Sequence, residues 1–186
     1  MVNIVPFVEI ASPQRERIAG EATEIFYETA YTRSFPSPEA KDEFHKRWFG
    51  HYLDTYPASF LLALDARGGA AVGYLAGCID SFSEAARVII AGIPNYTPAF
   101  LTAARDYPSH FHINVKPGHQ GQGVGRLLVE HFIRQCQASG SPGIHVVTGA
   151  ASRAVKFYEG CGFKRAAPFA DADPGVAVLL YAVRTP

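Results

Sequence analysis

Residues 109–148 constrain the fold of this 186-residue chain more than any other segment. SHFHINV, which begins at Ser109, has the pattern of a strand, and from Val124 onward apolar residues recur at helical spacing. GIHVVTG, which begins at Gly143, then predicts a short buried strand. A strand, a helix and a second strand within about forty residues predict a crossover, which makes the two strands a parallel pair.

The part of the chain before this crossover predicts three strands and two long helices. The strands are expected at 3–10, 59–66 and 70–80, the last two joined by a glycine turn. One helix is expected at 12–31, with Ser12 as its cap and Pro13 in its first turn, and the other at 38–56. Residues 81–108 hold two short helix-like pieces divided by prolines, which indicates an insertion or lid.

After the crossover, residues 151–163 predict a short helix that ends at Gly160 or Gly162. Two last strands are expected around the turn DADPG. The fold class is therefore α/β or mixed α+β, and the length predicts a single domain over residues 1–186.

Composition excludes several classes of function. Seventeen basic residues balance seventeen acidic ones, so nothing indicates binding to nucleic acid or to an anionic membrane, and a small-molecule partner is expected. No run approaches the length of a membrane span, and the N-terminal residues lack a secretory pattern. The three cysteines never form C-x-x-C, which argues against a disulfide framework and a zinc site and favours a cytoplasmic location.

The segment VKPGHQGQGVGRLL places three glycines at alternate positions where the strand meets the helix. A nucleotide P-loop is excluded because no Gly-Lys-Ser/Thr occurs in the chain. A dinucleotide fingerprint is excluded because the spacing is G-x-G-x-G and no acidic residue follows at the required distance. Backbone N–H groups of such a loop and of the first helical turn suit a pyrophosphate, although a plain tight turn would also use glycine.

Two motifs together resemble the GNAT superfamily of N-acetyltransferases. Gln120 to Gly125 match its pyrophosphate loop, [RQ]-x-x-G-x-[GA], and AVKFYEGCGF, which begins at Ala154, matches its A-x-x-x-Y segment before a G-F turn. The order of expected elements matches the family over nearly the whole chain. The resemblance implies a GNAT fold, with a mixed sheet of about seven strands, a splayed parallel pair and about four helices. More narrowly, the sequence around the loop resembles bacterial relatives of the acetyltransferase-like domain of O-GlcNAcases.

The resemblance implies an acetyl-CoA-dependent N-acetyltransferase that acts on a primary amine of a small molecule. Acetyl-CoA is then expected to bind to the strand, to the loop and to the start of the next helix. The residues expected to bind it are Ile113, Asn114, Val115, Gln120, Gly121, Gln122, Gly123, Val124, Gly125 and Arg126. Because dimers are frequent among relatives, a homodimer is a further expectation.

Tyr158 is the expected general acid, since the family places this tyrosine beside the thioester sulfur. His110, His112 and Asn114 alternate on one face of their strand, and histidine suits removal of a proton from an ammonium near neutral pH. His112 is the expected base, with His110 and Asp80 as alternatives. An H-x-H metal site is disfavoured because no third ligand is evident nearby, so no metal is expected.

One departure from the family concerns the residue three positions before the alanine of the tyrosine helix. Many relatives have Asn there, whereas this chain has Ala151. Ser152 is expected to replace part of that contact with the cofactor. The departure keeps open an alternative in which the chain is a non-catalytic module that binds acyl-CoA or a protein partner. A protein or peptide N-acetyltransferase is the nearest enzymatic alternative.

Overall fold

The structure is a computed structural model that describes residues 2–149, 152–169 and 178–185. The chain forms two compact units, and each is described by itself. Unit one consists of Met1–Gly77 and His112–Phe132, and unit two of Cys78–Phe111 and Ile133–Pro186. The strand that enters the crossover contributes its first half to unit two and its second half to unit one.

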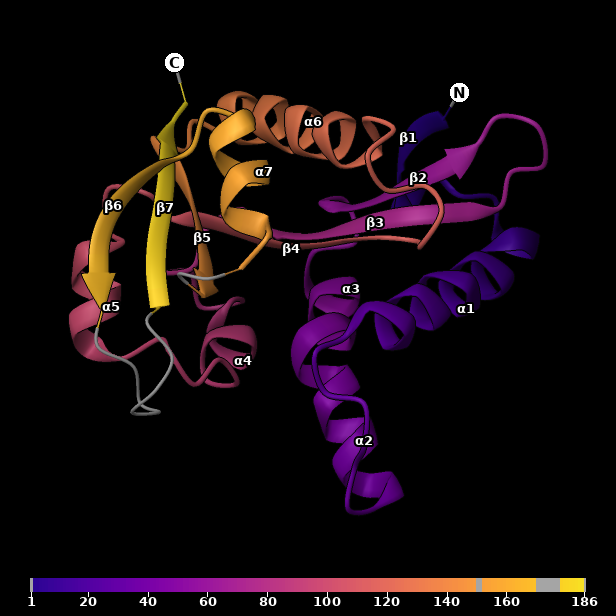
Figure 1. The fold of residues 1–186 in the computed structure, drawn as a ribbon, viewed down its shortest axis with the longest axis horizontal. Coiled ribbons are helices and arrows are strands. Elements are labelled where there is room, and N and C mark those ends of the chain that lie inside the picture. Colours follow the sequence, from indigo (N-terminus) through magenta and orange to yellow (C-terminus); the bar gives the residue numbers. More distant parts are fainter. Residues whose placement is uncertain (1, 150–151, 170–177, 186) are drawn as a thin grey trace. The chain divides into compact units, whose positions relative to one another are not determined.

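Unit one is built on strands in the order β1-β2-β3-β4, of which the first three are antiparallel (Figure 1). The strands are β1 Val2–Pro6, β2 Phe60–Asp65, β3 Ala71–Cys78 and β4 Ser109–Val115. β3 is buried along its whole length, so the core of the unit lies on both of its faces. The helices are the 3-10 turn Phe7–Glu9, α1 Ser12–Thr29, α2 Pro38–His45, a π-helix Lys46–Gly50, α3 His51–Thr55 and the first part of α6 Val124–Ala138.

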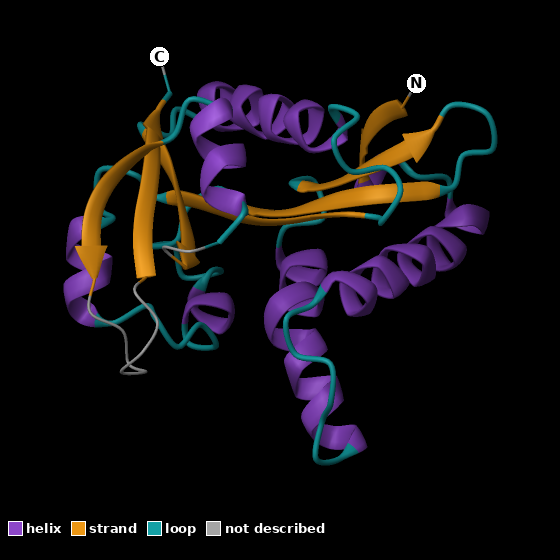
Figure 2. Ribbon diagram, viewed as in Figure 1, coloured by secondary structure: helices purple, strands orange, loops and turns teal. Residues whose placement is uncertain are grey.

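Unit two continues the sheet in the order β4-β5-β7-β6 (Figure 2). β4 and β5 form the parallel pair through Ser109–Ile144 and His110–His145, and their pairing ends there. β5 with β7 and β7 with β6 are antiparallel. The elements are α4 Arg87–Ile90, α5 Pro98–Ala103, β5 Gly143–Gly149, α7 Ala154–Gly160, β6 Lys164–Phe169 and β7 Val178–Arg184.

Over the described residues the predicted mixed sheet is confirmed, with seven strands and with β4 and β5 as a parallel pair. Both strands of the crossover have the predicted limits. The turn DADPG and Ala151 lie outside the described residues.

Over the described residues, the helices outnumber the four or so that the family resemblance implies. The described ranges hold seven α-helices, because 81–108 contributes α4 and α5 and because a π-turn divides the predicted helix 38–56 into α2 and α3. Ser12 is inside α1 rather than its cap: Ala11 has that place, and no side chain caps this end. The first strand is shorter than predicted, since Pro6 is followed by a 3-10 turn. None of the helices in the described ranges is both long and apolar enough to cross a lipid bilayer.

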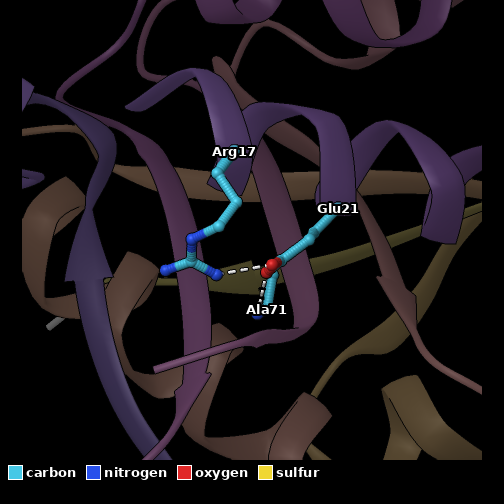
Figure 3. A network of polar contacts seen from close by, with 3 residues as sticks. All are labelled: Arg17, Glu21 and Ala71. Atoms are coloured by element: carbon cyan, nitrogen blue, oxygen red, sulfur yellow. Dashed lines mark hydrogen bonds and ion pairs between the residues drawn. The ribbon is translucent and has the colours of Figure 1, made fainter. Parts of the chain in front are cut away.

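A polar network joins α1 to the start of β3 in unit one (Figure 3). The Glu21 carboxylate accepts a hydrogen bond from the Ala71 N–H at 2.8 Å and one from the Arg17 guanidinium at 2.5 Å. The Ala71 amide lies at the end of the β2-β3 turn, where it would otherwise need water or another acceptor. Glu21 therefore anchors the helix to the hairpin across 50 residues of sequence.

Candidate active site

The glycine loop lies in unit one between β4 and α6. Gly118, Gly121 and Gly123 have φ angles of 85°, 74° and 84°, a left-handed conformation that other residues adopt only with strain. The Gln120 side chain donates to the Val115 carbonyl at 3.0 Å, and that of Gln122 donates to the Gly118 carbonyl at 2.7 Å. The two glutamines therefore use their amides to hold the loop in shape.

The first turn of α6 follows this loop directly. Val124 is buried and anchors the turn, whereas Gly121, Gly123 and Arg126 are exposed. Leu127 N–H bonds to the Gly123 carbonyl at 3.1 Å in the helical pattern, so the three amides before it have no acceptor within the helix. This first turn carries no acidic residue. Exposed amides, the positive end of the helix and the Arg126 side chain fit the diphosphate of a coenzyme A molecule.

The second half of β4 carries three further residues expected to bind the cofactor. Ile113, Asn114 and Val115 are all half-buried. The Asn114 side-chain amide donates to the Tyr74 hydroxyl of β3 at 2.7 Å. Burial raises the pKa of Tyr74, so this phenol stays protonated and its oxygen accepts the bond. The Asn114 side chain is thus bound to the neighbouring strand. The backbone of residues 113–115 is therefore the part of β4 that is suited to a cofactor.

His112, the expected base, is half-buried in unit one. Its ring packs edge-to-face against Trp48 at 4.8 Å between centroids and against Tyr52 at 5.4 Å. Trp48 belongs to the π-helix and Tyr52 to α3. Neither aromatic residue was among the expected site residues. Their i, i+4 spacing was the available signal that they contact one partner.

His110, the alternative base, is 1% exposed and lies in unit two. The Ser81 hydroxyl donates to the Pro108 carbonyl at 2.6 Å and therefore accepts from His110 Nδ1, 2.7 Å away. This bond assigns the Nδ1–H tautomer to the buried ring. His110 thus joins the two ends of residues 81–108 to the strand β4.

Asp80, the other alternative base, starts the same segment. Its carboxylate accepts a hydrogen bond from the Phe82 amide at 2.8 Å, and its carbonyl accepts one from the Ser83 hydroxyl at 2.8 Å. The first is an Asx-turn, in which the carboxylate replaces a backbone acceptor. Asp80 therefore shapes the turn that leaves β3.

Tyr158 is the last large side chain of α7 in unit two and is 8% exposed. Gly162 has φ 91°, Phe163 N–H bonds to the Tyr158 carbonyl at 3.0 Å, and Gly162 N–H bonds to the Glu159 carbonyl at 3.0 Å. These two bonds are those of a Schellman cap. The rings of Tyr158 and Phe163 lie 5.8 Å apart, which supplies the hydrophobic contact that accompanies such a cap. The residues from Tyr158 to Phe163 therefore end the helix, and the same contacts hold the tyrosine ring in place.

The surroundings of Tyr158 keep its phenol protonated. Phe111 of β4 packs edge-to-face on it at 6.1 Å. Burial, and to a smaller extent the charge of Cys161, raise the pKa of Tyr158. The phenol therefore carries a proton at neutral pH, and its raised pKa makes it a weaker acid than a free tyrosine.

Ser152, expected to contact the cofactor, is exposed just before α7. Its hydroxyl oxygen accepts a hydrogen bond from the Ala154 amide at 3.1 Å, and its own amide donates to the Gly149 carbonyl at 2.9 Å. Ser152 thus organises the start of α7, and its hydroxyl hydrogen is the group suited to a ligand. Over the described ranges, no three His, Cys, Asp or Glu residues gather in a way that suits a metal ion.

A glycine-rich loop between a strand and a helix, and a buried tyrosine on the next helix along the chain, are the features expected of an acyltransferase that uses coenzyme A. Residues 57–165 match the family model of the GNAT acetyltransferase domain, so the chain belongs to the GNAT acetyltransferase family.

Solved structures of the same fold cover all of this chain. SsHAT is 24% identical over 98% of its own length, with a TM-score of 0.70. An N-acetyltransferase from Staphylococcus aureus Mu50 is 14% identical over 99%, with a TM-score of 0.63. A chain of the NatC complex bound to Gag peptide and CoA is 15% identical over 99%, with a TM-score of 0.65. At these identities the similarity establishes the GNAT fold.

Proposed function

We propose that this acetyltransferase moves the acetyl group of acetyl-CoA to the primary amine of a small molecule. The observation that carries the proposal is Tyr158, a buried phenol whose position is fixed by the C-terminal cap of its own helix. The backbone amides of residues 121–126, at the loop and the first turn of α6, support binding of the diphosphate. The NatC complex was solved with CoA, which agrees with the same cofactor here. The narrower resemblance to relatives of O-GlcNAcases stays a prediction.

Each proposed residue has one task. Acetyl-CoA supplies the acetyl group as a thioester, so its transfer to an amine releases a thiolate that needs a proton. Tyr158 holds that proton at its phenol oxygen. His112 takes a proton from the acceptor ammonium at a ring nitrogen, and Trp48 and Tyr52 hold the ring in one orientation. The loop amides orient the cofactor without taking part in proton transfer.

The test of this assignment is Tyr158→Phe. Loss of the phenolic hydroxyl is expected to lower kcat by about a hundredfold or more, since general acids contribute effects of that order. The affinity for acetyl-CoA, measured by calorimetry, is expected to stay within about twofold, because the ring still packs on Phe111 and Phe163. Tyr31→Phe, at a fully exposed tyrosine, is the matched control. An unchanged kcat in Tyr158→Phe overturns the role of this residue.

Calorimetry also separates the enzyme from a non-catalytic module. The wild-type chain is expected to bind acetyl-CoA saturably, and the release of thiol with a panel of small amines is expected to identify an acceptor. No binding at millimolar acetyl-CoA contradicts the proposed activity. Binding without thiol release from any amine or peptide supports the module, for which the sequence departure at Ala151 is the motivation.

A small acceptor is proposed over a peptide because residues 81–108 form a closed, packed segment. Its ends meet through the Ser81 N–H bond to the Pro108 carbonyl at 2.9 Å. Its middle is fixed by Tyr96, whose hydroxyl lies 2.6 Å from His145 Nε2. The panel of acceptors therefore includes peptides, and faster turnover of a peptide than of any small amine contradicts this part of the proposal. We also infer that residues 1–186 act as one catalytic domain.

A further inference from the structure

A cavity of about 640 Å³ lies in unit one where the chain passes from α1 to α2. Its volume is within the range of small-molecule sites. The lining combines aromatic rings and prolines with hydroxyl groups and two cations, and it contains no acidic residue. The lining residues are Tyr27, Thr32, Arg33, Phe35, Pro36, Ser37, Pro38 and Lys41.

The aromatic part of the lining belongs to a packed cluster. The ring of Tyr27 meets that of Phe35 edge-to-face at 6.4 Å. Tyr27 also stacks on His45 at 5.6 Å and packs against Phe26 at 5.1 Å. Because Phe26 is a core residue of α1, the Tyr27 ring is a fixed surface against which a flat ligand can pack.

The two cations of the lining remain available to a ligand. Lys41 Nζ lies over the face of the Tyr27 ring, 4.5 Å from its centre, so the ammonium must move aside or bind the anion of a ligand that contacts this ring. Arg33 is exposed, and in the described part of the chain neither cation forms an ion pair with a carboxylate. A positive charge without a carboxylate partner favours an anion.

Two acidic residues lie near the cavity but outside its lining. Glu39 is engaged by the Ser37 hydroxyl, which also accepts a hydrogen bond from the Ala40 amide at 3.2 Å. The charge of Asp42 acts on Tyr27 and on His45: burial, and to a smaller extent this charge, raise the pKa of the Tyr27 phenol. These carboxylates moderate the local charge without occupying the cavity.

We propose that this cavity binds a small aromatic anion. The ring of the ligand packs against Tyr27 and Phe35, and its carboxylate or phosphate is bound by Arg33 and Lys41. Guanidinium groups bind either anion through paired N–H donors, and the ring supplies the apolar contact. None of the residues assigned to acetyl transfer lines the cavity. The inference therefore goes beyond the proposed function and does not depend on it.

NMR titration of the full chain with four ligands tests separately whether the charge and the aromatic ring of the ligand are recognised. Benzoate and phenyl phosphate are expected to bind saturably in the millimolar range. Benzamide lacks the charge and acetate lacks the ring, so each is expected to bind at least tenfold more weakly. Absence of saturable binding by both benzoate and phenyl phosphate at tens of millimolar overturns the proposal, as does acetate that binds as tightly as benzoate. A preference for phenyl phosphate over benzoate assigns the anion as a phosphate, and the reverse assigns a carboxylate.

Arg33 and Lys41 are both exposed, so substitutions there are expected to have little effect on folding. The double variant Arg33→Gln and Lys41→Gln is expected to weaken binding of the preferred anion at least tenfold, while Arg33→Lys retains part of it. Arg134→Gln, at an exposed arginine of α6, is the matched control and is expected to bind as the wild type does. Wild-type affinity in the double variant, or an equal loss in Arg134→Gln, overturns the proposal. Thermal unfolding of each variant verifies that the fold is intact.

Discussion

Trp48 and Tyr52 show how single residues far from β4 in sequence define the surroundings of His112. Both rings meet the imidazole edge-to-face, and Tyr52 is completely buried. Their spacing on the helix is compatible with ordinary packing, and nothing local reveals that the common partner is a histidine 60 or more residues later. The contact therefore became visible only when α3 and β4 were placed together in unit one.

Substitution of Trp48 tests whether this contact supports the proposed base. Trp48→Ala is expected to lower kcat about tenfold because the imidazole gains alternative orientations, and misplaced catalytic groups carry losses of this order. Trp48→Phe is expected to retain most of kcat, since an aromatic edge remains. The KM for acetyl-CoA is expected to stay unchanged in both variants. Steady-state kinetics checks this prediction.

His112→Gln is the companion to these variants. It is expected to lower kcat more strongly than Trp48→Ala and to remove the acidic limb of the pH-rate profile, since the amide does not titrate. If Trp48→Ala leaves kcat unchanged while His112→Gln abolishes it, the ring contact is structural. If His112→Gln has wild-type kcat, the base is another group.

The alternation of β4 predicted that His110 and His112 share a face, but it did not distinguish their roles. Alternation reports the direction of a side chain and not what covers it. His110 is buried and hydrogen-bonded to Ser81, whereas His112 is half-buried. The difference depends on the packing of residues 81–108, which local sequence does not encode.

At the scale of elements, the C-terminal cap of α7 stabilises the end of the helix and also contains Tyr158, the expected general acid. Gly162→Ala is expected to lower the free energy of unfolding by about 1 to 2 kcal/mol, because alanine is strained at φ 91°. Gly160→Ala is the matched control, since Gly160 is helical and alanine there is expected to leave stability unchanged or slightly higher. Urea denaturation of the three proteins measures the difference. Equal stability of the two variants contradicts this explanation of the motif.

The glycine loop is the element that the sequence described best. Its spacing and its missing residues excluded two nucleotide signatures, and the apolar patterns on either side predicted the strand and the helix at its ends. The motif [RQ]-x-x-G-x-[GA] specifies Gly123 and Gly125 and leaves the position of Gly121 free. Gly121 and Gly123 both require a positive φ, whereas Gly125 is the second residue of α6. Backbone conformation at such positions is local, so sequence predicts it well.

At the scale of the whole molecule, stability is expected to depend on pH through His145. Its Nδ1–H donates to the Tyr107 carbonyl at 2.5 Å, and its Nε2 accepts from the Tyr96 hydroxyl. Burial lowers the pKa of His145 to about 4 from an ordinary value of 6.5. Below pH 6.5 the unfolded chain binds a proton that the native state does not, so stability decreases as the pH falls toward 4. The loss through this group is about 3 kcal/mol.

Urea denaturation between pH 7 and pH 4.5 measures this dependence. His145→Gln is expected to be less stable at pH 7 and to lose less stability on acidification than the wild type, since its side chain does not titrate. His51→Gln, a histidine of α3 outside this network, is expected to keep the wild-type slope. Identical slopes in the wild type and His145→Gln contradict the assignment to His145.

The sequence by itself determined the fold class, the limits of both crossover strands, the glycine loop and the tyrosine of α7. These features depend on periodicity and on backbone conformation, which act over a few neighbouring residues. Only the tertiary structure decided what surrounds each candidate: Trp48 and Tyr52 around His112, Ser81 on His110, Tyr74 on Asn114, and the cavity beside Tyr27. These neighbours come from segments distant in the chain, and burial and hydrogen bonding set them only when those segments pack.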